Sequence, residues 1–139
     1  MNDKDCLFCK IVRGEIPSFK VYEDEHTLAF LDIHPVAPGH TLVVPKVHAT
    51  NIFDISSESW SRVSEMVRKV AIAIEGSLAA DGVNLMMNNR EHAGQVIEHP
   101  HMHLIPRFKG DGLKLWPHGA YKEGEAETVA KKISTSMYI

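Results

Sequence analysis

One long amphipathic helix constrains the fold of this chain more than any other feature of its sequence. Between Ser56 and about Ala80, apolar side chains recur at helical spacing. The stripe consists of Trp60, Val63, Met66, Val67, Val70, Ile74 and Leu78. We expect its Met and Trp side chains in the core rather than against a cofactor, and we expect Gly82, just after Asp81, to end the helix. A helix with one apolar face covers another layer, so the segments around it decide the fold class.

The segments around this helix indicate strands, because they are rich in β-branched and aromatic residues and are separated by turn residues. Three precede the helix and two follow it: FKVYED (19–24), TLAFLDI (27–33), HTLVVPK (40–46), VNLMMN (83–88) and VIEHPHMHLIPRF (96–108). A short first helix is predicted in CLFCKIVRG (6–14), with Gly14 as its stop, and a weakly helical tail in residues 123–137. The pattern predicts an α+β fold, a meander of five antiparallel strands with one long and one short helix covering one face.

Length and composition fit a single globular domain. A chain of 139 residues can bury a core without disulfides, and 44% apolar with 24% charged residues excludes a disordered or fibrous protein. The net charge of −3 argues against a nucleic-acid-binding surface. No apolar run approaches the ~18 residues of a membrane span, and the charged start MNDKDCLFCK lacks the apolar centre of a secretory signal. We therefore expect a cytoplasmic protein with neither a nucleic-acid nor a membrane partner.

Three histidines, His99, His101 and His103, occupy every second position of the last expected strand. In an extended strand such positions share one face, with neighbours about 7 Å apart. The row is consistent with an exposed edge, with a transition-metal site, or with catalysis by a neutral imidazole acting on an anionic substrate. Cys6 and Cys9, spaced C-x-x-C, indicate half of a zinc site or a redox pair. Spacing alone leaves these alternatives open.

The chain resembles the histidine-triad (HIT) superfamily. HPHMHLI (99–105) fits the His-x-His-x-His signature of that family, and AGQ (93–95) precedes the triad as it does there. Residues 6–48, from CLFCKIVRG to VPKVH, look like the N-terminal half of the nucleotide-hydrolase branch. The resemblance covers about residues 6–110. It implies a single HIT domain over residues 1–139, with residues 111–139 as a C-terminal extension, and a twofold homodimer whose sheets join.

The activity that the resemblance implies is that of a nucleotide hydrolase or nucleotidyl transferase. It would act at the α-phosphate of a purine nucleoside phosphoramidate, ester or dinucleoside polyphosphate. His101 would be the nucleophile and form a nucleotidyl-histidine, His103 would contact the phosphate, and His40 would join the proton network, with His99 completing the catalytic set. The alternative is a zinc-stabilised module that binds or senses nucleotides and hydrolyses them incidentally. No organic cofactor is expected.

The same resemblance implies a nucleotide-binding site. Asp32 would bind the ribose hydroxyls, while Asn88 and Gln95 would approach the phosphate and the leaving group. The base would lie in an apolar pocket formed by Phe8, Ile11, Ile16, Phe30 and Ile33. From the residues alone, a turn residue is the favoured interpretation of Asp32 and ordinary core that of Phe30 and Ile33, and His40 could also be a turn residue.

A structural zinc site is implied as well, because related family members complete the C-x-x-C pair with two histidines. The ligands would be Cys6, Cys9, His48 and His99. Such a tetrahedral Cys2His2 site is closed and leaves no position for catalysis. The histidines without a role in this scheme are expected at the surface: His26, His34, His92 and His118.

The sequence departs from the family pattern at Val96. Phosphoramidase members usually carry Ser or Thr directly after the Gly-Gln pair, where the hydroxyl can serve the leaving group. Valine cannot donate that hydrogen bond, so we expect weak hydrolysis of aminoacyl-type phosphoramidates. Glu98 is expected to face away from His99. In the C-terminal extension, Trp116 and Pro117 are expected either to influence the partner subunit's site or to anchor packing.

Overall fold

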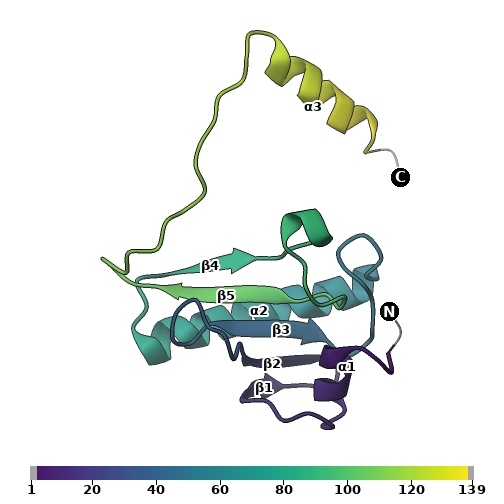
Figure 1. Cartoon of the computed structure of the whole chain (residues 1–139), viewed down its shortest axis with the longest axis vertical. Coiled ribbons are helices and arrows are strands. Elements are labelled where there is room, and N and C mark those ends of the chain that lie inside the picture. The colour runs from purple at the N-terminus through teal and green to yellow at the C-terminus, as the bar shows by residue number, and fades with distance from the viewer. Residues whose placement is uncertain (1–2, 138–139) are drawn as a thin grey trace.

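The computed structural model describes residues 3–137, and a five-stranded antiparallel sheet forms its centre. The strands are β1 (Lys20–Glu23), β2 (Thr27–Leu31), β3 (Thr41–Pro45), β4 (Gly82–Met86) and β5 (Met102–Arg107). Their order across the sheet is β1-β2-β3-β5-β4 (Figure 1). The antiparallel sheet is confirmed, but the meander is wrong, because β5 lies between β3 and β4. The long connection between β3 and β4, which contains α2, permits this order, because β4 does not have to pair with β3 and β5 can fill the position between them.

The helical segments are α1 (Leu7–Val12), α2 (Ser57–Leu78), the 3-10 turn η1 (Glu91–Ala93) and α3 (Glu125–Thr135). Ser56 caps α2, because its hydroxyl accepts the backbone N–H of Ser59 at 3.1 Å. The helix ends at Leu78, after which Ala79 adopts left-handed backbone angles with φ 53°. The expected stop at Gly82 is therefore wrong, and Gly82 is the first residue of β4.

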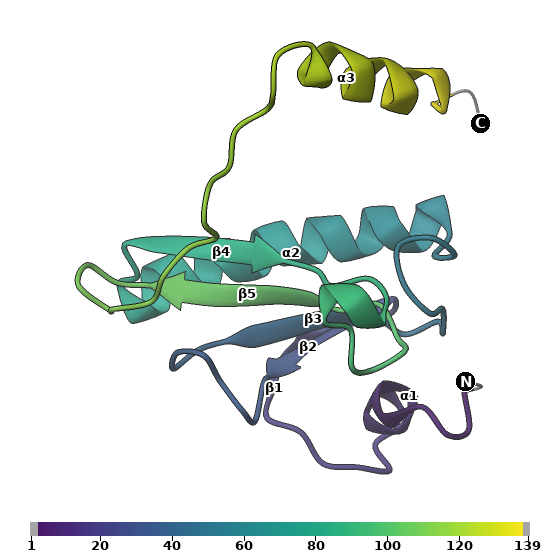
Figure 2. The same cartoon turned by 45° about the horizontal axis from the view of Figure 1, so that its top comes forward.

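The two faces of the sheet carry separate apolar cores, because successive side chains of a strand point to opposite faces. On one face, the stripe of α2 packs with Ala29, Val43 and Leu104. On the other face, residues in and beside α1 pack with Leu28, Phe30, Leu42 and Val44. Helices α1 and α2 therefore lie on opposite faces (Figure 2), not on one face as the sequence led us to expect. Strands β2 and β3 are apolar on both sides, which is why both faces need a cover.

The segment that carries the three histidines is only partly strand. β5 begins at Met102 rather than at Val96, so His99 and His101 precede it. Pro100 has no N–H to donate to a strand ladder, and the N–H of His99 turns back onto the carbonyl of Ile97 at 2.9 Å. Within β5, His103 pairs with a residue of β3 on one side and a residue of β4 on the other. Both neighbouring strands thus fix the position of His103.

The chain leaves the sheet after β5. Residues 112–122 have no regular secondary structure and lead to α3, which confirms the expected helical tail. α3 stands apart from the sheet, beyond β4, and buries none of its residues (Figures 1 and 2). No helix within residues 3–137 is long and apolar enough to cross a membrane.

Candidate active site and metal cluster

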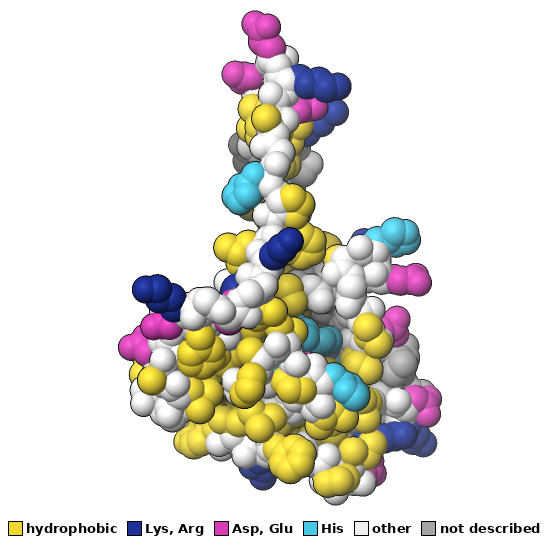
Figure 3. Space-filling view, turned by 60° about the vertical axis from the view of Figure 1, so that its left-hand side comes forward, with side chains coloured by type: hydrophobic (Ala, Val, Ile, Leu, Met, Phe, Trp, Pro, Cys, Tyr) yellow, Lys and Arg dark blue, Asp and Glu magenta, His cyan; other side chains and the backbone are white. Residues whose placement is uncertain are grey.

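A cavity of about 480 Å³ opens on the face of the sheet that carries α1. Small-molecule sites typically have volumes of about 300–1,000 Å³, so a nucleotide-sized ligand fits. The wall includes all the residues expected around a base: Phe8, Ile11, Ile16, Phe30 and Ile33. Polar groups in the wall include those of Asp32, Asn88, His101 and His103. Figure 3 shows a side of the molecule on which histidine side chains lie among hydrophobic ones.

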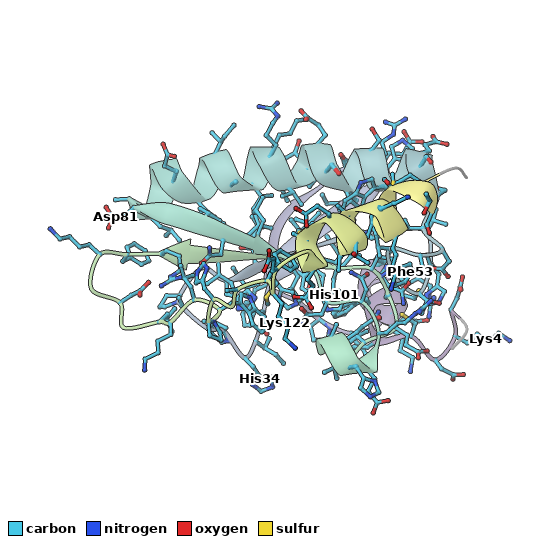
Figure 4. All side chains as sticks on the ribbon, turned by 90° about the horizontal axis from the view of Figure 1, so that it is seen from above. Lys4, His34, Phe53, Asp81, His101 and Lys122 are labelled. Atoms are coloured by element: carbon cyan, nitrogen blue, oxygen red, sulfur yellow. The ribbon has the colours of Figure 1, made fainter. Side chains whose placement is uncertain are left out.

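His101 lies in this wall, on the side of the sheet opposite α2 (Figure 4). Its Nδ1 is 2.7 Å from the backbone oxygen of His99; because a carbonyl only accepts, Nδ1 carries the proton and Nε2 has the lone pair. The ring of Phe8 packs against it at 5.1 Å. His101 is 7% exposed, and burial lowers its pKa below the ordinary 6.5. At pH 7 it is therefore a neutral imidazole with a nucleophilic nitrogen.

A chain of hydrogen bonds fixes the proton of His103. The N–H of Val36 donates to Nδ1 of His40 at 3.0 Å, so the proton of His40 is on Nε2. That Nε2–H donates to Nδ1 of His103 at 2.9 Å, which leaves the proton of His103 on its own Nε2. Burial lowers the pKa of both rings, to about 4 for His103, so both are neutral at pH 7. The ring of His103 lies 5.1 Å from that of His101 and offers an N–H donor beside the nucleophile.

Asp32 and Asn88 reach the cavity from the ends of two different strands, β2 and β4. Oδ1 of Asp32 accepts the N–H of His34 at 2.8 Å and so forms a turn, while Oδ2 lies 3.6 Å from Nε2 of His40. Asp32 is thus both a turn residue and a cavity residue. Asn88 lies against Gly94, whose φ of +95° favours glycine and where a Cβ would sit 3.4 Å from Nδ2 of Asn88.

Gln95 is not among the residues that line the cavity. Its Oε1 accepts the backbone N–H of Arg90 at 2.7 Å and the Nδ2 of Asn51 at 3.2 Å. Its Nε2 donates to the carbonyl oxygens of Thr50, at 2.6 Å, and Ile97, at 3.0 Å. The carboxamide has two N–H donors and one acceptor oxygen, and both sides are engaged. In this structure Gln95 therefore connects its own loop to the loop after β3, and its approach to the phosphate and leaving group stays a prediction.

Cys6, Cys9, His48 and His99 form a second cluster beside His101, and their ligand atoms lie within 4.8 Å of one another. Sγ of Cys6 is 3.4 Å from Nδ1 of His99, Sγ of Cys9 is 3.3 Å from Nδ1 of His48, and the two Nδ1 atoms are 3.3 Å apart. Tetrahedral zinc bonds, about 2.3 Å to sulfur and about 2.0–2.1 Å to nitrogen, place S and N about 3.6 Å apart and two N atoms about 3.3 Å apart. The observed spacings match such a site.

The proton positions in this cluster also fit a metal. Nε2 of His99 donates to the carbonyl of Pro45 at 2.8 Å, so the lone pair of Nδ1 faces the cluster. Burial and the neighbouring Cys6 raise the pKa of the Cys9 thiol to about 12, so a cation is needed to hold the Cys9 sulfur as a thiolate. This donor set can hold a metal ion. His99, which we expected both in the catalytic set and among the ligands, faces this cluster and does not line the cavity.

Asp32, His40 and His103 converge within 4.8 Å as well. This group is organised for hydrogen bonding rather than for a metal, because Nε2 of His40 carries a proton and has no lone pair to offer. The donor geometry of this group therefore gives no support to a catalytic metal ion held by His103 together with Asp32 and His40.

Some residues of the site had no signal in the sequence. Val36 acts through its backbone N–H, and Asn51 through a hydrogen bond to a loop far away in the chain. His34, expected at the surface, is exposed but also borders the cavity. Val96, which the family pattern did single out, lines the cavity as well and is 85% exposed. Together, the fold and the site define a protein with an apolar cavity of the size of a small-molecule site and with a neutral histidine in its wall.

Comparisons with known proteins identify the family. A HIT domain model matches residues 13–110. The chain is 46% identical to Protein hit of Bacillus subtilis, covering 96% of this chain and 95% of that protein. It is 38% identical to adenosine 5′-monophosphoramidase hnt1 of Schizosaccharomyces pombe, over 95% of this chain and 98% of that protein. It is 41% identical to adenylylsulfatase HINT3 of Arabidopsis thaliana, over 78% of this chain and 55% of that protein. The chain belongs to the HIT family.

Solved structures share the fold. A Streptococcus mutans protein, 42% identical, matches with a TM-score of 0.91 over 99% of this chain and 87% of that chain. A zinc-bound histidine triad family protein from Mycobacterium smegmatis, 34% identical, matches with a TM-score of 0.78 over 96% and 99%. The HIT-like fold expected from the sequence is thereby confirmed.

Proposed function

We propose that this protein is a nucleotide hydrolase or nucleotidyl transferase that works through a nucleotidyl-histidine. Its substrate is a purine nucleoside phosphoramidate, ester or dinucleoside polyphosphate, attacked at the α-phosphate. The observation that carries the proposal is the hydrogen bond from Nδ1 of His101 to the carbonyl of His99, which leaves Nε2 as a nucleophile in the cavity wall. The names of hnt1 and HINT3 support a hydrolase acting on nucleotides at the level of reaction class.

In this proposal the apolar end of the cavity covers the base, and Oδ2 of Asp32 accepts from the ribose hydroxyls. The Nε2–H of His103 donates to an oxygen of the α-phosphate, and the Asn88 amide lies toward the leaving group. Among the described residues that line the cavity, none is Lys or Arg. Neutral N–H donors, fixed before the substrate arrives, therefore stabilise the charge that develops on the phosphoryl oxygens.

The reaction proceeds in two displacements. In the first, the lone pair on Nε2 of His101 attacks phosphorus, the N–P bond forms, and the bond to the leaving group breaks with its electron pair departing on that group. In the second, water attacks the nucleotidyl-histidine, a P–O bond forms, and the N–P electron pair returns to Nε2. The proton that this water releases to solvent balances the proton that the leaving group takes up from solvent in the first step. The His99 carbonyl accepts from Nδ1 in both steps and stabilises the positive charge on the nucleotidylated ring.

We propose further that Cys6, Cys9, His48 and His99 hold a structural zinc ion, and the zinc-bound Mycobacterium smegmatis protein supports this assignment. Bound there, zinc would contribute stability rather than reactivity, because four protein ligands leave no open position. Cys6 caps the N-terminus of α1 and Cys9 lies within this helix, while the carbonyl of His99 orients His101. The site would thus tether α1 to the segment that positions the nucleophile.

A twofold homodimer is also part of this proposal, since it is the commonest symmetry of soluble oligomers and β4 leaves one sheet edge open among the described strands. The cytoplasmic location and the treatment of residues 1–139 as one domain with an extension from residue 111 stay predictions of the sequence.

The variant His101→Ala tests the proposed activity, with His26→Ala as a control that removes an imidazole outside the cavity. We expect His101→Ala to bind AMP in isothermal titration and to lose at least about 10³-fold in turnover, while His26→Ala retains both. If His101→Ala kept turnover, the covalent route would be wrong. If the wild type bound AMP but turned over none of the three substrate classes, the zinc-stabilised binding module would be the better description.

A further inference from the structure

Arg90 has a backbone conformation that arginine rarely adopts. Its φ of 74° and ψ of 161° lie in a region that is populated almost only by glycine. Hydrogen bonds hold this conformation on both sides of the residue. The N–H of Arg90 donates to Oε1 of Gln95 at 2.7 Å, and its carbonyl accepts the N–H groups of Ala93 and Gln95, both at 3.1 Å. An arginine kept in such a conformation costs stability, which points to a use for its side chain.

An aromatic ring holds the side chain of Arg90 in place. The guanidinium carbon lies 4.2 Å from the centre of the Phe53 ring, which is a cation–π contact. In Figure 4, Phe53 lies near η1, the turn that follows Arg90. Both residues are exposed, and within residues 3–137 no carboxylate forms an ion pair with Arg90. The ring therefore fixes the plane of the guanidinium, and its N–H groups are available to an anion from solution.

The Phe53–Arg90 pair lies on the leaving-group side of the proposed active site. Asn88, two residues before Arg90, lines the cavity, as does Val96, the residue after Gln95. The backbone hydrogen bond from Gln95 to Arg90 keeps these two segments together. Asn88 and Val96 are the residues expected near the leaving group. Arg90 therefore stands beside the end of the cavity from which the leaving group departs.

The charge of the cavity is suited to one phosphate but not to several. None of the described residues in its wall is Lys or Arg, so only neutral groups and Asp32 meet the α-phosphate and the ribose there. The leaving nucleotide of a dinucleoside polyphosphate carries additional charged phosphates, which extend outward on the leaving-group side. A guanidinium can donate two parallel hydrogen bonds to the oxygens of a phosphate. Arg90 places such a group outside the wall, where a small leaving group does not reach.

Val96 favours the same leaving group on chemical grounds. An amine needs a proton in order to depart, and valine, which lines the cavity at the expected position, offers none. A nucleoside phosphate departs as an anion, because the second pKa of a phosphate monoester is about 6. The bond from the α-phosphorus to the bridging oxygen breaks and its electron pair stays on that oxygen, so the site needs no proton donor. The apolar residue at 96 and the cation at 90 thus favour the same class of substrate.

We infer that Arg90, held on the ring of Phe53, binds the phosphates of a leaving nucleotide and so selects dinucleoside polyphosphates among the three proposed substrate classes. In the first displacement, Nε2 of His101 forms the bond to phosphorus, and the guanidinium of Arg90 stabilises the negative charge on the departing phosphate chain. The inference rests on the proposed function and names the substrate class of the same site. Binding of the dinucleotide does not require turnover, so it can be measured apart from the reaction.

Binding to a protein without the nucleophile tests the inference. Isothermal titration would compare diadenosine tetraphosphate with AMP, first in His101→Ala and then in the double variant that also carries Arg90→Gly. We expect His101→Ala to bind the dinucleotide at least about tenfold more tightly than AMP. Arg90→Gly should reduce this preference at least about fivefold and leave the affinity for AMP within about twofold. No preference in His101→Ala, a preference that survives Arg90→Gly, or an equal loss for both ligands would overturn the inference.

Two controls separate binding from fold and from net charge. Glycine adopts the backbone angles of residue 90 without strain, so the urea midpoint of Arg90→Gly should not fall below that of the wild type. A clear fall would show that Arg90 serves the fold and would contradict the inference. Arg62→Ala removes an exposed arginine from α2, on the face of the sheet opposite the cavity, and should leave the preference within about twofold. A loss as large as that of Arg90→Gly would reduce the effect to net charge and overturn the inference.

Turnover by the wild type distinguishes the inference from the proposed function. If Arg90→Gly abolished the binding preference but the wild type turned over none of the three substrate classes, the proposed function would be wrong and the nucleotide-binding role of Arg90 would stand. If the wild type turned over a phosphoramidate and a dinucleotide, and Arg90→Gly left the ratio of their kcat/KM values unchanged, the function would stand and the role of Arg90 would be wrong.

Discussion

Gln95 offers the sharpest test of how the site is built, because its side chain closes a loop in the structure, whereas the sequence predicts a contact with the substrate. Replacing Gln95→Ala removes hydrogen bonds to four partners, two backbone carbonyls, one backbone N–H and the Asn51 amide. At about 1 kcal/mol net for each hydrogen bond, the free energy of unfolding falls by about 4 kcal/mol. Because the exposed backbone N–H of Arg90 can hydrogen-bond to water instead, the expected decrease is about 2–4 kcal/mol. Asn51 is 6% exposed and does not recover a partner so readily.

Urea unfolding measures this loss. With a denaturant slope of about 2 kcal/mol per molar, the midpoint should fall by about 1–2 M without a change in slope. Asn88→Ala is the matched control, because it removes an amide that lines the cavity. We expect Asn88→Ala to keep the free energy of unfolding within about 0.5 kcal/mol of the wild-type value and to reduce kcat/KM. Should Gln95→Ala unfold at the wild-type midpoint and yet lose activity, Gln95 would act on the substrate and the loop-closure account would be refuted.

Three further expectations follow from the same geometry. Val96→Thr keeps the branched shape and adds one hydroxyl at the cavity, so kcat/KM for a nucleoside phosphoramidate should rise about tenfold, with Val96→Ala giving no rise. Metal analysis should find one zinc per chain in the wild type and almost none in Cys9→Ser, and chelation should lower the melting temperature of the wild type alone. Burial holds the pKa of His103 at about 4, below its ordinary 6.5, so folding excludes a proton that the unfolded chain binds. Stability should therefore be full above about pH 6.5 and fall as the pH drops toward 4, more steeply than in His103→Gln.

The sheet and the long helix could be predicted because their residues act locally. Apolar residues at helical spacing specify α2, and alternating apolar residues in β2 and β3 pack in two cores. The order of the strands could not be predicted in this way, since pairing of β5 between β3 and β4 depends on contacts distant in sequence. The early end of α2 at Ala79 also had no signal, because a left-handed alanine is not a usual stop.

The site shows the same division. The family resemblance placed the apolar pocket residues, Asp32, Asn88, His101 and His103 together, and they do line one cavity. The prediction that all three histidines share one strand was only partly right, because Pro100 interrupts the hydrogen-bond ladder and the strand begins at Met102. His99 instead faces the cysteines. The proton on His103 is set by the backbone of Val36 through His40. A backbone donor carries no signature in a sequence, so only the structure could supply this link.

The most direct test of the central claim is the mass of the intact protein after brief mixing with an adenosine phosphoramidate and, separately, with a dinucleoside polyphosphate. The reaction should be stopped with denaturant at alkaline pH, since a phosphorus–imidazole bond is labile in acid. The account predicts one added adenylyl group on the wild type, located on His101, and none on His101→Ala. An adduct that persists in His101→Ala, or turnover of either substrate by the wild type without any adduct under single-turnover conditions, would contradict it.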